Sequence, residues 1–217
     1  MTFDLTLGPV LPAGVTEIHA VTAVQAYGFT WVNLDPVSAL SAAPQLGASS
    51  LVVSRSWAPP AYPLAYTLTL SNTGNAPSAA TWLTATLPGD LISVTASSLA
   101  YDPILHRLTW QGSVPVASPV TLTFSGVVSP TLTACGQLSV TASLRDELGQ
   151  ATPLAAAVNL AVPDVDCSGA VNILDIQRVA GRWGAAIGDP GYDPRADLDG
   201  DDQIGVWDVI IAASHWQ

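Results

Sequence analysis

A 33-residue internal repeat in the last quarter of the chain constrains its fold more than any other feature. The first copy begins Asp164-Val-Asp166 and the second begins Asp197-Leu-Asp199, and further acids recur as Asp175 and Asp208. Residues 164–217 hold ten acids and three arginines, so this quarter carries −7 of the net charge of −11. Carboxylates at such a density repel one another. The segment must therefore stay unfolded or fold around a cation.

Each repeat begins with a twelve-residue loop whose oxygen-bearing residues have the spacing of calcium ligands. Calcium takes about six to eight oxygen ligands, which an EF-hand loop supplies from positions 1, 3, 5, 7, 9 and 12. In the first loop these positions are Asp164, Asp166, Ser168, the carbonyl of Ala170, Asn172 (through water) and Asp175. In the second they are Asp197, Asp199, Asp201, the carbonyl of Gln203, a water near Gly205, and Asp208. We expect two bound calcium ions, with folding of this segment coupled to their binding.

Position 6 of each loop is where the chain must turn sharply. It is Gly169 in the first loop and Asp202 in the second, which departs from the usual glycine. Aspartate tolerates a left-handed backbone better than most residues, so we expect the turn in both loops.

After each loop the apolar spacing becomes helical. Apolar residues fall at i, i+3, i+4 and i+7 from Ile176 to Trp183 and again from Val209 to Trp216, which predicts a short amphipathic helix after each loop. Because large aromatic residues dominate small cores, we expect the two equivalent tryptophans to pack between the helices, with contact to a ligand as the alternative.

The larger part of the chain alternates apolar and hydroxyl residues with a period of two. Such runs include 66–71, 82–87, 120–125 and 138–144, and turn signals such as Asn72-Thr-Gly-Asn75 separate them. Period-two runs without intervening helical patterns predict a two-sheet β-sandwich, placed at 49–162. Residues 1–48 contain further strand-like runs and a linker. They are either extra strands on the sandwich, which we favour because their apolar residues need a partner face, or the remnant of an upstream domain.

The β-region resembles a known family. The run Tyr66–Ala76, the segment Ala85–Gly89 and the strand Leu108–Trp110 are similar to the conserved-repeat Ig-like domain of bacterial surface proteins. The family's Asp before the Leu-Pro pair is Ala85 or Thr86 here. The resemblance implies an Ig-like spacer without catalytic activity.

The two loop–helix units, residues 163–217, resemble a type I dockerin, in which the position-12 ligand is Asp. The resemblance implies a small α-module that binds a cohesin, a β-sandwich receptor on a protein scaffold or cell surface. In dockerins, positions 10 and 11 of each loop help to recognise the cohesin; here these are Ile173, Leu174, Val206 and Trp207. All four are apolar, whereas many dockerins carry hydroxyls there, and the linker from Gly184 to Ala196 is longer than usual. An Ig-like module directly before a dockerin also resembles pairs in which the sandwich steadies the dockerin.

The two cysteines fit a single disulfide. If strands 137–144 and 154–162 form an antiparallel hairpin in which paired numbers sum to about 299, Cys135 lies opposite residue 164 and close to Cys167. We expect a bond that ties the sandwich to the first calcium loop, and hence an oxidising, extracellular setting. The alternative is two unrelated thiols.

Composition excludes several other functions. Six arginines and no lysine against seventeen acids argue against binding nucleic acid or an anionic membrane. No apolar run reaches the roughly 18 residues of a membrane helix, and residues 1–10 show no signal-peptide pattern, so a secreted chain is expected to be a mature portion of something longer. The three histidines lie on separate elements and no nucleophile motif occurs, so we expect no enzyme.

Two alternatives to a cohesin-binding module stay open. One is a calcium-stabilised structural domain of a surface or filament protein. The other is a carbohydrate-binding sandwich that uses Trp31, Trp57, Trp82 or Trp110. Trp82 shares a predicted face with hydroxyl residues and is expected to be exposed. Exposed tryptophans on one flat face would favour sugar binding, and buried ones a spacer.

Overall fold

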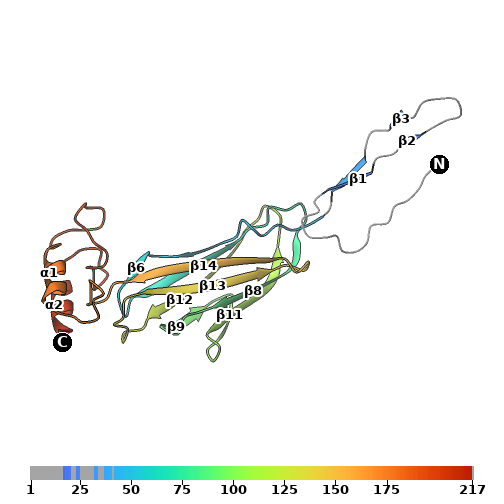
Figure 1. The fold of residues 1–217 in the computed structure, drawn as a ribbon. Helices are drawn as coiled ribbons and strands as arrows, with labels where there is room; N and C mark the ends of the chain where they lie inside the picture. The colour runs from blue at the N-terminus through green and yellow to red at the C-terminus, as the bar shows by residue number, and fades with distance from the viewer. Residues whose placement is uncertain (1–16, 21–22, 25–31, 34–36, 41, 217) are drawn as a thin grey trace.

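The computed structural model describes residues 17–20, 23–24, 32–33, 37–40 and 42–216. The protein is mainly β: two sheets face each other as a sandwich, and two short helices follow at one end of it (Figure 1). The prediction of a mainly β chain with a two-sheet sandwich is thus confirmed.

The larger sheet has six strands in the order β10-β11-β8-β13-β14-β6. Their bounds are Ala100–Asp102 (β10), Arg107–Val114 (β11), Ser78–Thr86 (β8), Gln137–Arg145 (β13), Ala151–Leu160 (β14) and Trp57–Ala58 (β6). All neighbours are antiparallel except β14 and β6, which are parallel. The short β6 therefore closes this sheet on the side where the chain leaves β14 for the helices.

The smaller sheet has four antiparallel strands in the order β5-β7-β12-β9. Their bounds are Ser50–Val53 (β5), Pro63–Leu70 (β7), Val120–Val128 (β12) and Leu91–Ala96 (β9). Tyr66 of β7 lies directly opposite Phe124 of β12, and their rings stack with centroids 4.7 Å apart.

The core lies between the two sheets and follows the period-two pattern. Along β13, Leu138, Val140, Ala142 and Leu144 are buried while the residues between them are exposed. Strand β7 alternates in the same way over most of its length. Since burying one such aliphatic side chain contributes about 1.5–3 kcal/mol, the alternation supplies the main driving force for the sandwich.

The sandwich begins slightly before residue 49. The backbone amide of Gln45 donates to Asn72 Oδ1 at 2.9 Å, and the amide of Thr73 donates to the Gln45 carbonyl at 2.9 Å. Gly74 comes so close to this segment that a Cβ there would lie 2.3 Å from the Ala43 carbonyl oxygen. The turn therefore needs glycine, and the segment from Ala43 belongs to the sandwich.

A carboxylate ties the start of β8 to the β13–β14 turn. Glu147 accepts hydrogen bonds from Ser78 Oγ at 2.6 Å and from the amides of Ala79 and Ala80 at 3.1 and 3.4 Å. Burial acts to raise the pKa of Glu147, but these hydrogen bonds outweigh it and hold that pKa below its usual value. The ionised form of Glu147 therefore stabilises this corner.

The strands before the sandwich pair with one another. Strand β1 (Glu17–Ala20) pairs with β4 (Val37–Leu40), and β2 (Ala23–Val24) pairs with β3 (Val32–Asn33). Among the residues that the structure describes, none of these four strands joins either sandwich sheet. Strand pairing thus gives no support to the alternative in which residues 1–48 extend the sandwich.

Two loop–helix units follow the sandwich. Helix α1 spans Ile173–Ala180 and α2 spans Val206–Ser214, and the two pack against each other. In α1 the side chain of Asn172 caps the amide of Leu174, and Asp175 completes a capping box. In the described part of the chain, no helix is long and apolar enough to cross a membrane.

The predicted tryptophan packing is wrong. Helix α1 ends at Ala180 with Gly181 as its cap, so Trp183 lies beyond the helix and is 59% exposed; Trp216 is 54% exposed. The small core instead holds Val179, Ala212 and Ile204, together with other residues from the linker and the sandwich. Smaller side chains thus form this core, and the tryptophan that packs against it is Trp57 of the sandwich.

Candidate metal centres

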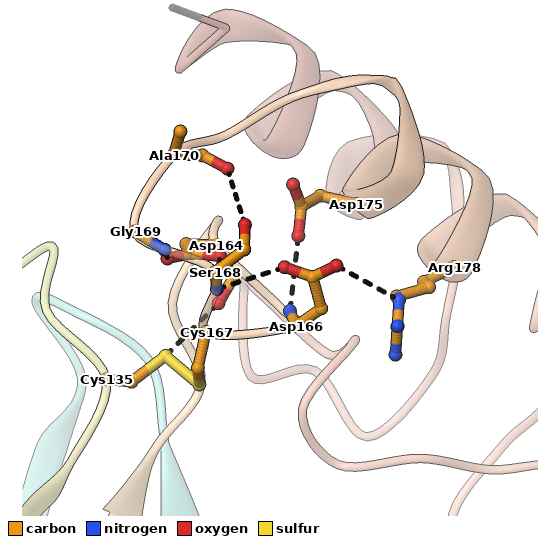
Figure 2. The surroundings of a disulfide bond; sticks show 9 residues. All are labelled: Cys135, Asp164, Asp166, Cys167, Ser168, Gly169, Ala170, Asp175 and Arg178. Carbon is orange, nitrogen blue, oxygen red and sulfur yellow. Dashed lines mark hydrogen bonds and ion pairs between the residues drawn. A yellow bond between two sulfur atoms is a disulfide. The ribbon is translucent and has the colours of Figure 1, made fainter.

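The first loop gathers three carboxylates at the end of the sandwich (Figure 2). One oxygen each of Asp164, Asp166 and Asp175 lie within 4.8 Å of one another. The amides of Ser168 and Gly169 donate to Asp164 at 3.0 and 2.8 Å, which wraps the loop around this side chain. Backbone N–H groups of the loop therefore point at the Asp164 carboxylate and partly offset the repulsion among the three carboxylates.

The other predicted ligands of the first loop lie beside this cluster. The Ala170 carbonyl accepts from Ser168 Oγ at 3.3 Å and from Asn172 Nδ2 at 3.2 Å. Hydrogen bonds from Ser168, supported by Arg178 at 3.6 Å, hold the pKa of Asp166 below its usual value. Asp166 is thus ionised at neutral pH and available to a cation.

The second loop repeats the cluster with Asp197, Asp199 and Asp208, whose oxygens also lie within 4.8 Å of one another. Asp208 accepts from the amides of Leu198 and Gly205, both at 2.6 Å. Burial raises the pKa of Asp197, although hydrogen bonds from Tyr192 and the backbone oppose this shift. Burial, with neighbouring carboxylates, also raises the pKa of Asp199. Ionisation of Asp197 and Asp199 is therefore less favourable here than in water.

Asp201, a predicted ligand of the second loop, lies outside this carboxylate cluster. Asp201 is exposed and accepts a hydrogen bond from the amide of Gln203 at 2.9 Å. Gln203 itself forms an antiparallel bridge with Ala186 of the linker. The long linker therefore folds back along the second loop.

Both loops turn through the same backbone conformation. Position 6 is left-handed in each, with φ of +94° at Gly169 and +68° at Asp202. Position 4 is left-handed as well, with +57° at Cys167 and +79° at Gly200. The expected turn at Asp202 is thus confirmed, and the sequence repeat is also a repeat of backbone geometry.

The donor set fits a hard divalent cation. Both clusters offer only oxygen, with no cysteine or histidine in the described clusters. Oxygen-only sets suit calcium, magnesium or manganese and disfavour zinc and copper. A cation bound there would neutralise repelling carboxylates and thereby stabilise the two loops.

The predicted disulfide is confirmed. Cys135 and Cys167 are bonded, with Cα atoms 5.8 Å apart. The strand register differs from the expected one, because Gln137 pairs with Asn159 and not with residue 162. Paired residue numbers therefore sum to 296, three less than expected, and the residues between the end of β14 and Cys167 still bring the two cysteines together. The bond joins the segment before β13 to position 4 of the first loop.

Two residues outside the predicted loops contact the second cluster. Tyr192 Oη donates to Asp197 Oδ2 at 2.6 Å, and Arg55 lies 3.7 Å from the same oxygen. Sequence reasoning missed both. Tyr192 lies in the linker and Arg55 lies in the sandwich, so neither follows a ligand spacing that could have revealed it.

The predicted partner-binding residues are all exposed. Ile173 and Leu174 begin α1 and are 48% and 53% exposed; Val206 and Trp207 begin α2 and are 50% and 63% exposed. We call these four residues the helix-start patch. Each helix thus begins with two neighbouring apolar side chains that are exposed to solvent.

The candidate sugar-binding tryptophans are mostly not exposed. Trp82 is 42% exposed on the outer face of the six-stranded sheet, whereas Trp57 and Trp110 are partly buried against the cores. Trp31 lies outside the described residues.

Comparisons with known proteins assign no family. No protein-family model and no curated protein matches the chain. Similar solved structures include the CARDB domain of a Pyrococcus furiosus protein in complex with di-metal ions, which is 15% identical with a TM-score of 0.36 and covers 54% of this chain and 90% of its own. A chain from a type I cohesin–dockerin complex of Clostridium thermocellum is 11% identical, with a TM-score of 0.36, and covers 52% and 98%. The seventh ScaB type I cohesin from Pseudobacteroides cellulosolvens is 10% identical, with a TM-score of 0.36, and covers 52% and 92%. These TM-scores are too low to carry an argument about the fold. The evidence for the sandwich is the strand pairing described above.

Proposed function

We propose that the chain is a non-catalytic attachment module, in which a β-sandwich spacer carries a calcium-dependent, dockerin-like unit that binds a cohesin-type partner. The observation that carries this proposal is the pair of equivalent carboxylate clusters, held in loops of repeated backbone geometry. A solvated acidic tail would not place three carboxylates twice within 4.8 Å.

The first calcium ion would be held by Asp164, Asp166, Ser168, Asp175 and the Ala170 carbonyl, with Asn172 acting through water. The second would be held by Asp197, Asp199, Asp208 and the Gln203 carbonyl, with Asp201 turning inward. Bound calcium supplies positive charge and does no chemistry. Since the loops also form the helix starts, calcium would order α1 and α2 together with the helix-start patch.

The helix-start patch supports a protein partner. Its four apolar side chains, each about half exposed, occupy loop positions 10 and 11, the positions that help dockerins to recognise a cohesin. Apolar anchors at the centre of an interface supply most of its binding energy. The disulfide supports an oxidising and hence extracellular setting.

Calcium binding is tested by titration calorimetry on the whole chain. We expect two ions for the unmodified protein and none for the double variant Asp164→Ala, Asp197→Ala. Asp193→Ala is the matched control, because Asp193 lies between the two loops and pairs with Arg195. Circular dichroism should show that the double variant loses helix and keeps its β-signal. Retention of both ions by the double variant would exclude these loops as the sites.

Partner binding is tested by pull-down with a panel of cohesins, in calcium and in chelator. We expect capture in calcium only, with loss of capture in Trp207→Asp. Ile104→Asp, a change at an apolar residue that is 90% exposed on the sandwich, should have no effect. Calcium binding without capture of any cohesin would favour a calcium-stabilised structural domain instead.

The exposure of Trp82 favours one further candidate, a carbohydrate-binding face. Trp82 lies directly between Gln111 and Arg145 on neighbouring strands, so an aromatic ring is flanked by hydrogen-bond donors. Affinity electrophoresis in soluble polysaccharides tests this candidate. Retardation that Trp82→Ala abolishes would support sugar binding, and unretarded migration of the unmodified protein would oppose it.

A further inference from the structure

Arg55, which lies between β5 and β6, reaches from the sandwich into the second loop. Its Nη1 donates to the Gly200 carbonyl at 2.8 Å, and its Nη2 forms an ion pair with Asp202. Its guanidinium also lies over the Tyr62 ring, 4.7 Å from the centroid. The Arg55 side chain is only 18% exposed, whereas that of Asp202 is 45% exposed and Gly200 is buried, so the hydrogen bond to the Gly200 carbonyl is the better shielded of the two contacts.

The second loop also fits against the sandwich by shape. At Gly200 a Cβ would lie 2.6 Å from the Tyr62 ring and 3.2 Å from Pro59. Ala161, at the end of β14, is fully buried in the small core of the helical unit, and Trp57 of β6 packs against the same core. The loop backbone is thus pressed directly onto the sandwich surface.

Asp202 gains a role from this contact. Position 6 of such loops is usually glycine, because its left-handed backbone is less favourable for a residue with a side chain, such as Asp202. Its side chain is the acceptor that meets Arg55. The departure from glycine therefore provides a contact between the two parts of the chain that glycine could not make.

We propose that Arg55 is a positioning residue that locks the second loop onto the sandwich, so that calcium at this site sets the orientation of the helix-start patch relative to the sandwich. This inference rests on the proposed calcium binding. An ordered second loop presents the Gly200 carbonyl and Asp202 together, which the fork of a guanidinium matches and a single ammonium cannot. The disulfide separately holds the first loop to the sandwich, so the helical unit is attached to the sandwich at both loops.

Arg178 provides a matched control. It too places a guanidinium beside a loop carboxylate, 3.6 Å from Asp166 in the first loop, but both of these residues belong to the helical unit. Arg55→Ala and Arg178→Ala therefore remove the same charge next to a site, and only the former removes a contact with the sandwich. Effects of charge on calcium affinity are shared by the two variants.

The experiment is hydrogen exchange with mass spectrometry on the whole oxidised chain, in calcium and in chelator, with small-angle scattering on the same samples. In calcium, Arg55→Ala should raise exchange in residues 54–58 and 198–204 by about 10-fold, since a hydrogen bond to a charged group is lost. It should also broaden the scattering-derived distance distribution. The unmodified protein should show both changes only in chelator, and Arg178→Ala should not raise exchange in residues 54–58.

Asp202→Gly removes one of the two acceptors of Arg55 and leaves the Gly200 carbonyl, while it restores the usual loop residue. It should therefore raise exchange in the same residues as Arg55→Ala, to a smaller extent. The inference is overturned if either variant, with two calcium ions bound by calorimetry, matches the unmodified protein in exchange and scattering. Absence of calcium binding in the unmodified protein overturns the proposed function itself, so the two failures are distinct.

Discussion

Removing the disulfide should destabilise the protein by an amount that reports how its two parts unfold. The bond closes a loop with a sequence separation of 32 residues. In the chain-entropy model, a loop of that size stabilises the folded state by about 3.7 kcal/mol if the whole chain unfolds together. That closed segment contains β13, β14 and the first four residues of the first loop.

A smaller value is expected if the helical unit unfolds alone. The β13–β14 hairpin then stays folded, and the Leu160 amide still donates to the Gly136 carbonyl at 3.0 Å, next to Cys135. Only the segment 161–167 is freed within the cross-link. The same model then gives about 2 kcal/mol.

The assay is urea unfolding of the double variant Cys135→Ser, Cys167→Ser against the oxidised protein in saturating calcium, followed by circular dichroism. Serine at position 167 bears the same cost of a left-handed backbone as cysteine, so the difference in unfolding free energy reports the cross-link alone. The oxidised protein treated with reductant serves as a second control. An unchanged unfolding free energy in the double variant would refute this account of the bond.

Three further changes test the fold. Glu147→Gln should lower the free energy of unfolding by only about 1 kcal/mol at pH 7, since Glu147 is exposed. Hydrogen bonds hold the folded-state pKa of Glu147 below the usual 4.5, so its stabilising effect is present above pH 4.5 and is lost as the pH falls through the lowered pKa. Thermal melts of the two proteins should therefore converge in acid. Gly200→Ala should destabilise the helical unit by at least about 1 kcal/mol through its φ of +79° and its contact with Tyr62, whereas Gly47→Ala, with no atom within 4 Å, should be neutral in the same urea titration. Leu144→Ala should cost about 2–5 kcal/mol in urea unfolding, since Leu144 is fully buried, and a smaller loss would show that the core can collapse around the cavity.

The features that followed from sequence are those set by neighbouring residues. Hydroxyl and apolar residues alternate over β7 and β13, so the pleat alone decides which side chains face the core. The loop turns were predictable for the same reason, because Gly169 and Asp202 tolerate the left-handed backbone that their loops need. The disulfide followed from the hairpin, although the register differed.

The features that sequence could not reveal depend on which distant surfaces meet. Arg55 precedes Asp202 by 147 residues, and nothing in its neighbours marks it as a contact of the second loop. Trp183 has helical spacing, yet the helix ends before it, at Gly181. Periodicity describes a face and does not say where the helix stops or how much space lies beneath it.

The disulfide also governs how the molecule bears mechanical tension. The helical unit lies at one end of the sandwich, and β1 to β4 lie beyond the other end (Figure 1). A pull on the helical unit enters the sandwich by two covalent routes, the backbone into β14 and the sulfur bridge to the residue before β13. The force is shared by two antiparallel strands pulled from the same end, so their hydrogen bonds are not peeled apart from each other one at a time. The bridge therefore passes tension to two strands of the six-stranded sheet at once.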